Sequence, residues 1–135
     1  MTKEADAQLH GPDGGVIPRR VEKPWGHELW WAHTEHYAGK MIIVEPGHRL
    51  SLQYHREKDE TSHLLSGKLL LVQAGADGEL VETEIGPGHS WRNTPGLVHT
   101  IEALELATVL EVSTPHLDDV VRLDDRYGRE GTSAH

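Results

Sequence analysis

The sequence contains no cysteine and no phenylalanine, and only two methionines. Without cysteine, disulfides, thiolate nucleophiles and sulfur-ligated zinc sites are excluded. Without phenylalanine, the core must be built from leucine, valine, isoleucine and the four tryptophans. Eleven histidines are many for a chain of 135 residues. Imidazole and carboxylate groups are therefore the strong metal ligands that remain.

The sequence also lacks the run of about 18 apolar residues that a membrane-spanning helix needs. Basic residues are few, since 13 Lys and Arg against 22 Asp and Glu give a net charge of −9. Such a chain repels nucleic acid and anionic lipid unless its basic residues gather on one face. The N-terminal segment has no apolar core of the kind found in signal peptides. We therefore expect a cytoplasmic protein without a membrane or nucleic-acid partner.

The apolar residues show no helical periodicity, apart from one helical turn expected near Leu117–Val121. Glycine- and proline-rich turns instead separate short runs that favour β-structure, which indicates a single-domain barrel or sandwich. We expect a mobile arm at 1–20, the barrel and a C-terminal strap at 21–129, and a tail at 130–135. The expected strands are His27–Trp31, Gly39–Val44, Leu50–His55, Thr61–Leu65, Lys68–Gln73, Leu80–Glu84, His89–Arg92, Val98–Ala103 and Thr108–Thr114.

Two clusters in this pattern contain groups that bind metal ions. Gln53 and His55 are two residues apart on an expected strand, so their side chains lie on one face and can converge on one ion. Glu60 can return to the same point from the next strand, and His99, after the turn Thr94-Pro95-Gly96, can approach from the opposite side. We predict that Gln53, His55, Glu60 and His99 bind one divalent ion, with Zn, Mn and Fe all compatible.

The spacing of these residues resembles the two signature motifs of the cupin superfamily, a group of small β-barrel metalloproteins. The first motif, from Gly47 to Gly67, has Gln53 where the family has its first histidine. The second, from Gly88 through His99, has Thr94 in place of proline and Ala103 in place of asparagine. The resemblance implies an all-β double-stranded β-helix, or jelly-roll barrel. It also implies a homodimer, because small cupins commonly pair.

The Gln-x-His variant narrows the resemblance to the phosphomannose isomerases, in particular the C-terminal cupin domain of the bifunctional type II enzymes. The string Pro46–His55 carries the likeness, and so do the flanking strings Val21–Gly26 and Leu117–Arg129. The guanylyltransferase domain of those enzymes does not fit into this chain. The resemblance implies aldose–ketose isomerisation of a mannose-6-phosphate-like sugar through a metal-stabilised enediol.

A phosphorylated sugar needs basic residues near the metal, because the chain as a whole repels anions. We predict that Lys40, Arg49 and Arg92 bind this substrate, and that Lys40 also serves in catalysis. Lys40 and Arg49 occupy positions that are basic in the isomerase-like pattern. Arg49 also shares its parity with Gln53 and His55, which places all three on one face of a regular strand.

Two other functions remain open from the sequence. One is an iron-dependent oxygenase or lyase acting on a small molecule, as in many free-standing cupins, which an apolar pocket would favour. The other is a non-catalytic module that binds a sugar or another metabolite, which a complete ligand set without a nearby base would favour. A cluster of cations at the pocket favours the isomerase. We also expect the strap Leu117–Arg129 to dock on the barrel and to form one side of the site.

Overall fold

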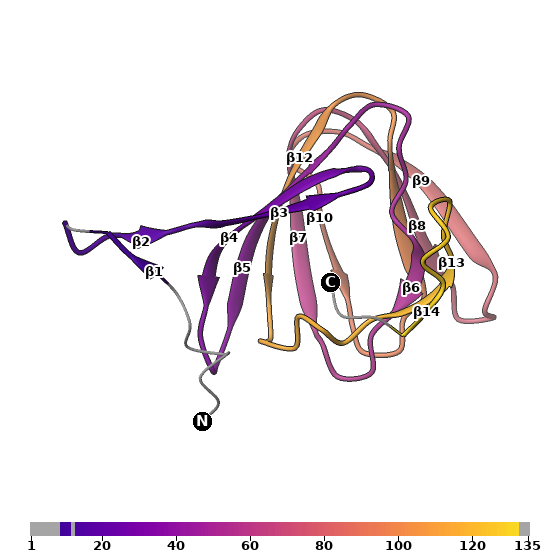
Figure 1. Cartoon of the computed structure of the whole chain (residues 1–135). Helices are drawn as coiled ribbons and strands as arrows, with labels where there is room; N and C mark the ends of the chain where they lie inside the picture. The colour runs from indigo at the N-terminus through magenta and orange to yellow at the C-terminus, as the bar shows by residue number, and fades with distance from the viewer. Residues whose placement is uncertain (1–8, 12, 133–135) are drawn as a thin grey trace.

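The computed structural model describes residues 9–11 and 13–132. Every element assigned there is a β-strand, and the strands form two six-stranded antiparallel sheets and a separate hairpin (Figure 1). The described residues contain no helix that is long and apolar enough to cross a membrane. The expected helical turn near Leu117–Val121 is absent: residues 117 and 118 form a short turn, and Val121 already begins a strand. Backbone bonds from Leu117 to Pro115 and from Asp119 to His116 close this turn.

The two large sheets face each other and close into the jelly-roll barrel, which confirms the predicted fold (Figure 1). The first sheet has the spatial order β10 (Ser90–Asn93), β7 (Glu60–Ser66), β12 (Ala107–Ser113), β5 (Ala38–Val44), β4 (Gly26–His33) and β3 (Arg19–Lys23). The second has the order β14 (Gly131–Thr132), β13 (Val121–Asp124), β6 (Leu52–Tyr54), β11 (His99–Ala103), β8 (Leu69–Ala74) and β9 (Leu80–Ile85).

Each of the nine expected runs contains a strand, and the structure adds five strands near the ends of the chain. The hairpin of β1 (Leu9–His10) and β2 (Val16–Ile17) projects away from the barrel within the expected arm (Figure 1). The strand β3 continues from it into the first sheet, while β13 and β14 extend the second sheet. The mobility of the arm stays a prediction, and its residues 1–8 and 12 lie outside the described residues, as do 133–135 of the tail.

Side chains inside the barrel change from polar to apolar along the strands. Along β5 the inward series is Lys40, Ile42 and Val44, all buried. The antiparallel neighbour β12 shows the same change, because its Glu111 lies opposite Lys40 while Ala107 lies opposite Val44. The barrel interior therefore has an apolar end and a polar end.

The apolar end is a single packed cluster. Its buried members are Trp25, Ile42, Val44, Leu64, Leu69, Leu71, Ile85, Trp91, Ile101, Ala103, Ala107 and Val109. The turn from β7 to β8 closes this end through Gly67, whose φ is +91°. A Cβ atom there would lie 2.1 Å from the carbonyl oxygen of Leu106, so the close approach of the two backbones requires glycine.

Candidate metal centre

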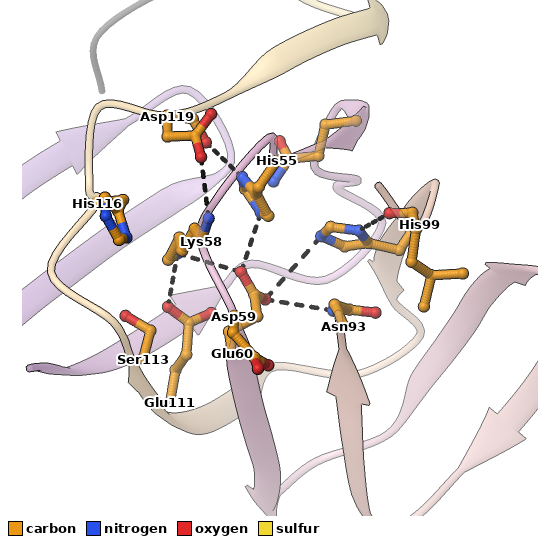
Figure 2. A network of polar contacts seen from close by, with 12 residues as sticks. His55, Lys58, Asp59, Glu60, Asn93, His99, Glu111, Ser113, His116 and Asp119 are labelled. Carbon is orange, nitrogen blue, oxygen red and sulfur yellow. Dashed lines mark hydrogen bonds and ion pairs between the residues drawn. The ribbon is translucent and has the colours of Figure 1, made fainter. Parts of the chain in front are cut away.

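Three of the four predicted metal ligands meet at the polar end of the barrel. His55 follows β6, while Glu60 and His99 begin β7 and β11, and all three side chains are buried. One ligand atom from each residue lies within 4.8 Å of the other two (Figure 2). The Nε2 atom of His55 is 2.9 Å from Oε1 of Glu60, and Nε2 of His99 is 3.9 Å from Oε2 of Glu60.

The backbone sets which nitrogen of each imidazole carries the proton. His55 Nδ1 is 2.5 Å from the carbonyl oxygen of Asp119, and His99 Nδ1 is 2.8 Å from that of Leu97. A carbonyl oxygen only accepts, so both Nδ1 atoms donate. In the neutral rings Nε2 then keeps its lone pair and points at Glu60. Burial lowers the pKa of His99 below its ordinary value, which keeps this ring neutral at pH 7.

The arrangement fits a metal ion. His55 Nε2 is buried and has no hydrogen-bond partner within the described part of the chain, although Oε1 of Glu60 is close. A neutral Nε2 and a carboxylate oxygen both accept, so a contact at this separation is satisfied either by a shared proton or by a metal ion that both atoms bind. Two imidazoles and one carboxylate are the donors that Zn, Mn and Fe share.

The fourth predicted ligand, Gln53, lies in the same pocket. Its backbone pairs with His99 across β6 and β11, and its side chain lines the cavity that Glu60 and His99 also line. The Oε1 atom of Gln53 accepts a hydrogen bond of 2.6 Å from the hydroxyl of Ser51. An amide oxygen has two lone pairs, so Gln53 keeps one for an ion. Its role as a ligand stays a prediction.

Two neighbours hold the carboxylate of Glu60 in place (Figure 2). The ammonium of Lys58 lies 3.1 Å from Oε1, and the amide of Asn93 donates to Oε2 at 3.2 Å. Gln73 in turn donates to Oδ1 of Asn93 at 2.9 Å, which fixes the orientation of that amide. Burial alone would raise the pKa of Glu60, but the charge of Lys58 and the contact with His55 lower it well below its ordinary value. Glu60 is therefore ionised and ready to bind a cation.

A chain of buried ion pairs continues from Glu60 across the first sheet. Lys58 also binds Glu111 at 3.1 Å, and Lys40 lies 3.9 Å from Glu111 and 3.1 Å from Glu28. Burial alone would raise the pKa of Glu28, but the charges of Lys40 and Lys23 lower it to about 2. Glu28 therefore remains charged although it is buried.

In this chain of ion pairs the carboxylates outnumber the ammonium groups. Three carboxylates, Glu28, Glu60 and Glu111, face the two ammonium groups of Lys40 and Lys58. Burial raises the pKa of Glu111, and the nearby charge of Glu60 raises it further. Glu111 is therefore the member that takes up a proton most readily. A divalent ion at Glu60 would change the formal charge of the cluster from −1 to +1, which favours an anionic ligand.

Of the three predicted substrate-binding cations, the structure brings only Lys40 into this pocket. The alternation of β6 is regular only from Leu52, so Arg49 turns away and pairs with Glu102 at 2.9 Å. Arg92 lies on the outer side of β10, where it is exposed and binds Asp59 at 2.6 Å. Their role in binding phosphate stays a prediction, but neither lines the cavity at the metal centre.

Sequence reasoning missed several charged residues of the pocket. Glu28 and Glu111 occupy inward positions on strands that are otherwise apolar on that face, next to Trp30 and Val109. Strand alternation alone predicts which residues face inward, so a charged residue at such a position could have indicated a buried polar site from the sequence. Lys58 lies in the irregular turn between β6 and β7, where parity gives no such signal.

The strap contributes to the site through its backbone and its apolar side chains. Besides the carbonyl bond to His55, the carboxylate of Asp119 accepts the backbone N–H groups of residues 56, 57 and 58. Leu117 and Val120 are buried beside the same pocket, whereas Leu123 is 49% exposed. The strap therefore fixes both the turn that carries Lys58 and the orientation of the His55 ring.

Comparisons with known proteins show which sequences resemble this chain. The family model for the C-terminal region of mannose-6-phosphate isomerase matches residues 14–125. Mannose-1-phosphate guanylyltransferase ManC of Salmonella typhimurium is 34% identical over 116 residues, which is 82% of this chain and 23% of that protein. Xanthan biosynthesis protein XanB of Xanthomonas campestris is 33% identical over 134 residues, or 94% of this chain and 28% of that protein. The chain thus spans about a quarter of the length of these relatives.

Solved structures extend the likeness of the fold. Oxalate decarboxylase from Bacillus subtilis superposes with a TM-score of 0.69 over 78% of this chain and 30% of that one, at 21% identity. At this identity the likeness shows the cupin fold and no more.

Proposed function

Because the chain belongs to the mannose-6-phosphate isomerase C-terminal family, we propose that it is a metal-dependent isomerase of a mannose-6-phosphate-like sugar. The observation that carries the proposal is the pair of imidazoles whose Nε2 atoms converge on one buried carboxylate, Glu60. The mannose phosphates in the names of the family and of its relatives support the choice of substrate.

Aldose–ketose isomerisation moves a proton between two neighbouring carbons. A divalent ion bound by His55, Glu60, His99 and Gln53 would stabilise the negative charge that develops on the substrate oxygens. The protein itself must supply a group that takes and returns the proton, and must keep water away from it. The buried ion pairs beside the metal centre contain candidates for the group that transfers the proton.

We assign the proton transfer to Lys40. Its ammonium lies inside the pocket, on the strand that pairs with the strand of Glu111. To act as a base, Lys40 must first lose a proton, and Glu111 at 3.9 Å is the group whose raised pKa suits it to receive that proton. Glu28 at 3.1 Å holds the side chain in place.

The test measures interconversion of mannose 6-phosphate and fructose 6-phosphate by the full chain loaded with Zn, Mn or Fe. In deuterated water the wild type should also incorporate deuterium at C1 of fructose 6-phosphate and at C2 of mannose 6-phosphate. Lys40→Met should lower kcat by roughly 10²–10⁴-fold, the usual contribution of general acid–base catalysis, while metal content is retained. Lys68→Met is the matched control, because the Lys68 side chain is partly exposed, lies outside the metal pocket and pairs with Glu84.

Absence of turnover with all three metals would refute the isomerase. Consumption of dioxygen with an unphosphorylated compound would point instead to an oxygenase. Binding of a neutral sugar without any turnover would indicate a non-catalytic module.

A further inference from the structure

A second cavity adjoins the metal centre and contains an unusual number of cations. It shares Gln53, Ser51 and Lys40 with the metal pocket, and His55 forms part of its wall. The basic residues that line it are Lys23, Lys40, Lys58, Arg122 and Arg129. Glu28 is the one acidic residue in this lining. In a chain with a net charge of −9, such a concentration of positive charge needs an explanation.

Three of these cations already have carboxylate partners. Lys40 and Lys58 belong to the ion pairs at the metal centre. The guanidinium of Arg129 binds Asp125 through two bonds, of 2.8 Å from Nε and 3.1 Å from Nη2. These three residues therefore have little need of a ligand.

Arg122 and Lys23 are different. Arg122 is only 6% exposed, and its Nε and Nη1 atoms are buried without a hydrogen-bond partner in residues 9–11 and 13–132. Lys23 is partly buried, and burial lowers its pKa to about 8; the charge of Glu28 opposes this shift, and the charges of Lys40, Arg122 and Arg129 add to it. A buried guanidinium with free donors is costly unless an anion completes it. Both groups belong to the lining of the cavity.

We propose that Arg122 and Lys23 form a binding site for a phosphate monoester dianion next to the metal centre. Neither cation forms an ion pair with a carboxylate in the described residues, although the charge of Glu28 acts on both. Two such cations match the two negative charges of a phosphate better than the single charge of a carboxylate. The free Nε and Nη1 donors suit two phosphate oxygens, because a guanidinium presents its N–H groups as a fork. That the phosphate belongs to an isomerised sugar rests on the proposed function, whereas the anion site itself does not.

The position of Arg122 explains how one ligand would reach both sites. Arg122 lies on β13 of the strap, and its backbone pairs with Gln53 on β6. Leu117 and Val120 of the same strap line the cavity. A sugar phosphate can thus place its phosphate at Arg122 and its reacting carbons at the predicted ligands Gln53 and His55. The strap supplies the phosphate end of the site, and the motif strands supply the metal end.

The test titrates inorganic phosphate, mannose 6-phosphate, glucuronate and mannose into the full chain by calorimetry. The titrations are made on the metal-loaded protein and again after chelation, because phosphate also binds metals directly. Both phosphates should bind in each form, and mannose should not bind after chelation. Arg122→Met should weaken both phosphates by about 10- to 100-fold, the loss expected for a charged hydrogen bond. Arg126→Met is the matched control, because Arg126 lies on the same strap but pairs with Glu102 outside the cavity.

A second readout separates a binding role from a structural one. Removal of an unpartnered buried charge should leave the Tm of the ligand-free Arg122→Met variant equal to or above that of the wild type, while the rise in Tm with added phosphate is lost. A fall in Tm, with phosphate affinity unchanged in the folded fraction, would show that Arg122 is structural. If Arg122→Met does not fold, Arg122→Lys serves as the second variant. It keeps the positive charge but lacks the paired donors of the guanidinium, so it should bind phosphate more weakly than the wild type.

The outcomes for this site and for the proposed isomerase differ. Phosphate binding that depends on Arg122, together with no turnover, would support the anion site and refute the isomerase. Turnover by the wild type, together with a phosphate affinity that Arg122→Met leaves unchanged, would support the isomerase and refute the anion site. Glucuronate that binds as tightly as phosphate after chelation would overturn the assignment to a dianion.

Discussion

The two ends of the barrel interior are built from the same strands but serve different purposes. At the apolar end, Leu64 and Leu69 are fully buried among other hydrocarbon side chains. At the polar end, Glu60 lies on the same strand as Leu64 and is also buried, but charged groups surround it. Burial stabilises the first end at roughly 1.5–3 kcal/mol per large aliphatic side chain, whereas buried charges at best break even. We infer that the polar end is retained for its chemistry and the apolar end for stability.

The largest effect that separates the two ends should come from removing a metal ligand. His99→Ala should lower metal affinity by about a hundredfold or more. Loss of a residue that only hydrogen-bonds to a metal ligand already costs about 10–100-fold in affinity, and His99 is itself a predicted ligand. Metal content and affinity are measured by titration after chelation. His89→Ala, on the exposed turn before β10, should bind metal like the wild type. Unchanged affinity in folded His99→Ala would mean that the ion, if bound, lies elsewhere.

The next effect concerns the apolar end and should leave metal binding intact. Leu64→Ala removes a fully buried side chain from the centre of the cluster and should destabilise the protein by about 2–5 kcal/mol. Leu65→Ala is the matched control, because the adjacent side chain is 50% exposed on the opposite face of β7. The measurement is denaturant unfolding together with metal titration of the folded protein. A large loss of metal affinity in Leu64→Ala would show that the two ends are not independent.

The two ends also differ in how far the sequence alone predicts them. Period-two alternation and turn glycines locate the strands, because both reflect local backbone geometry. His55 and Glu60 are close in the chain, so their meeting follows from one short turn. Arg122, in contrast, reaches the site only because the strap pairs with β6, which depends on closure of the whole barrel.

For Arg49, the sequence predicts a position in the pocket that the structure does not show. Parity assigns it to the face of Gln53, but residues 50 and 51 do not belong to a regular strand, and the alternation is lost before β6 begins. Its isolated bridge with Glu102 directs it away from the pocket. Spacing is therefore informative only within a continuous strand.

A smaller effect should appear as a pH dependence specific to the polar end. The pKa of Glu28 is about 2 in the folded protein and near 4.5 in the unfolded chain, so its contribution to stability is full above pH 4.5 and is lost as the pH falls toward 2. The shift corresponds to at most about 3 kcal/mol at pH 7. Glu28→Gln should therefore be less stable than the wild type at pH 7, and the difference should shrink steadily below pH 4.5.

The control for this titration is Glu82→Gln, on the exposed face of β9. It should unfold like the wild type across the same pH range. A difference between Glu28→Gln and the wild type that does not vary with pH would mean that Glu28 contributes through packing rather than through its charge.

The smallest expected effect is the uptake of a fraction of a proton when phosphate binds. It tests whether Lys23 belongs to the anion site at the polar end. Because the pKa of Lys23 is about 8, this group is about half protonated at pH 8 in the ligand-free protein. A bound phosphate favours the charged form and raises that pKa, so binding at pH 8 should take up about half a proton. Calorimetry of phosphate binding in buffers of different ionisation enthalpy measures this uptake. It should disappear in Lys23→Met and persist in Lys68→Met, whose side chain pairs with Glu84 on the surface. Equal proton uptake in all three proteins would show that another group titrates and that Lys23 does not belong to the anion site. The role of Arg122 would still be tested by Arg122→Met.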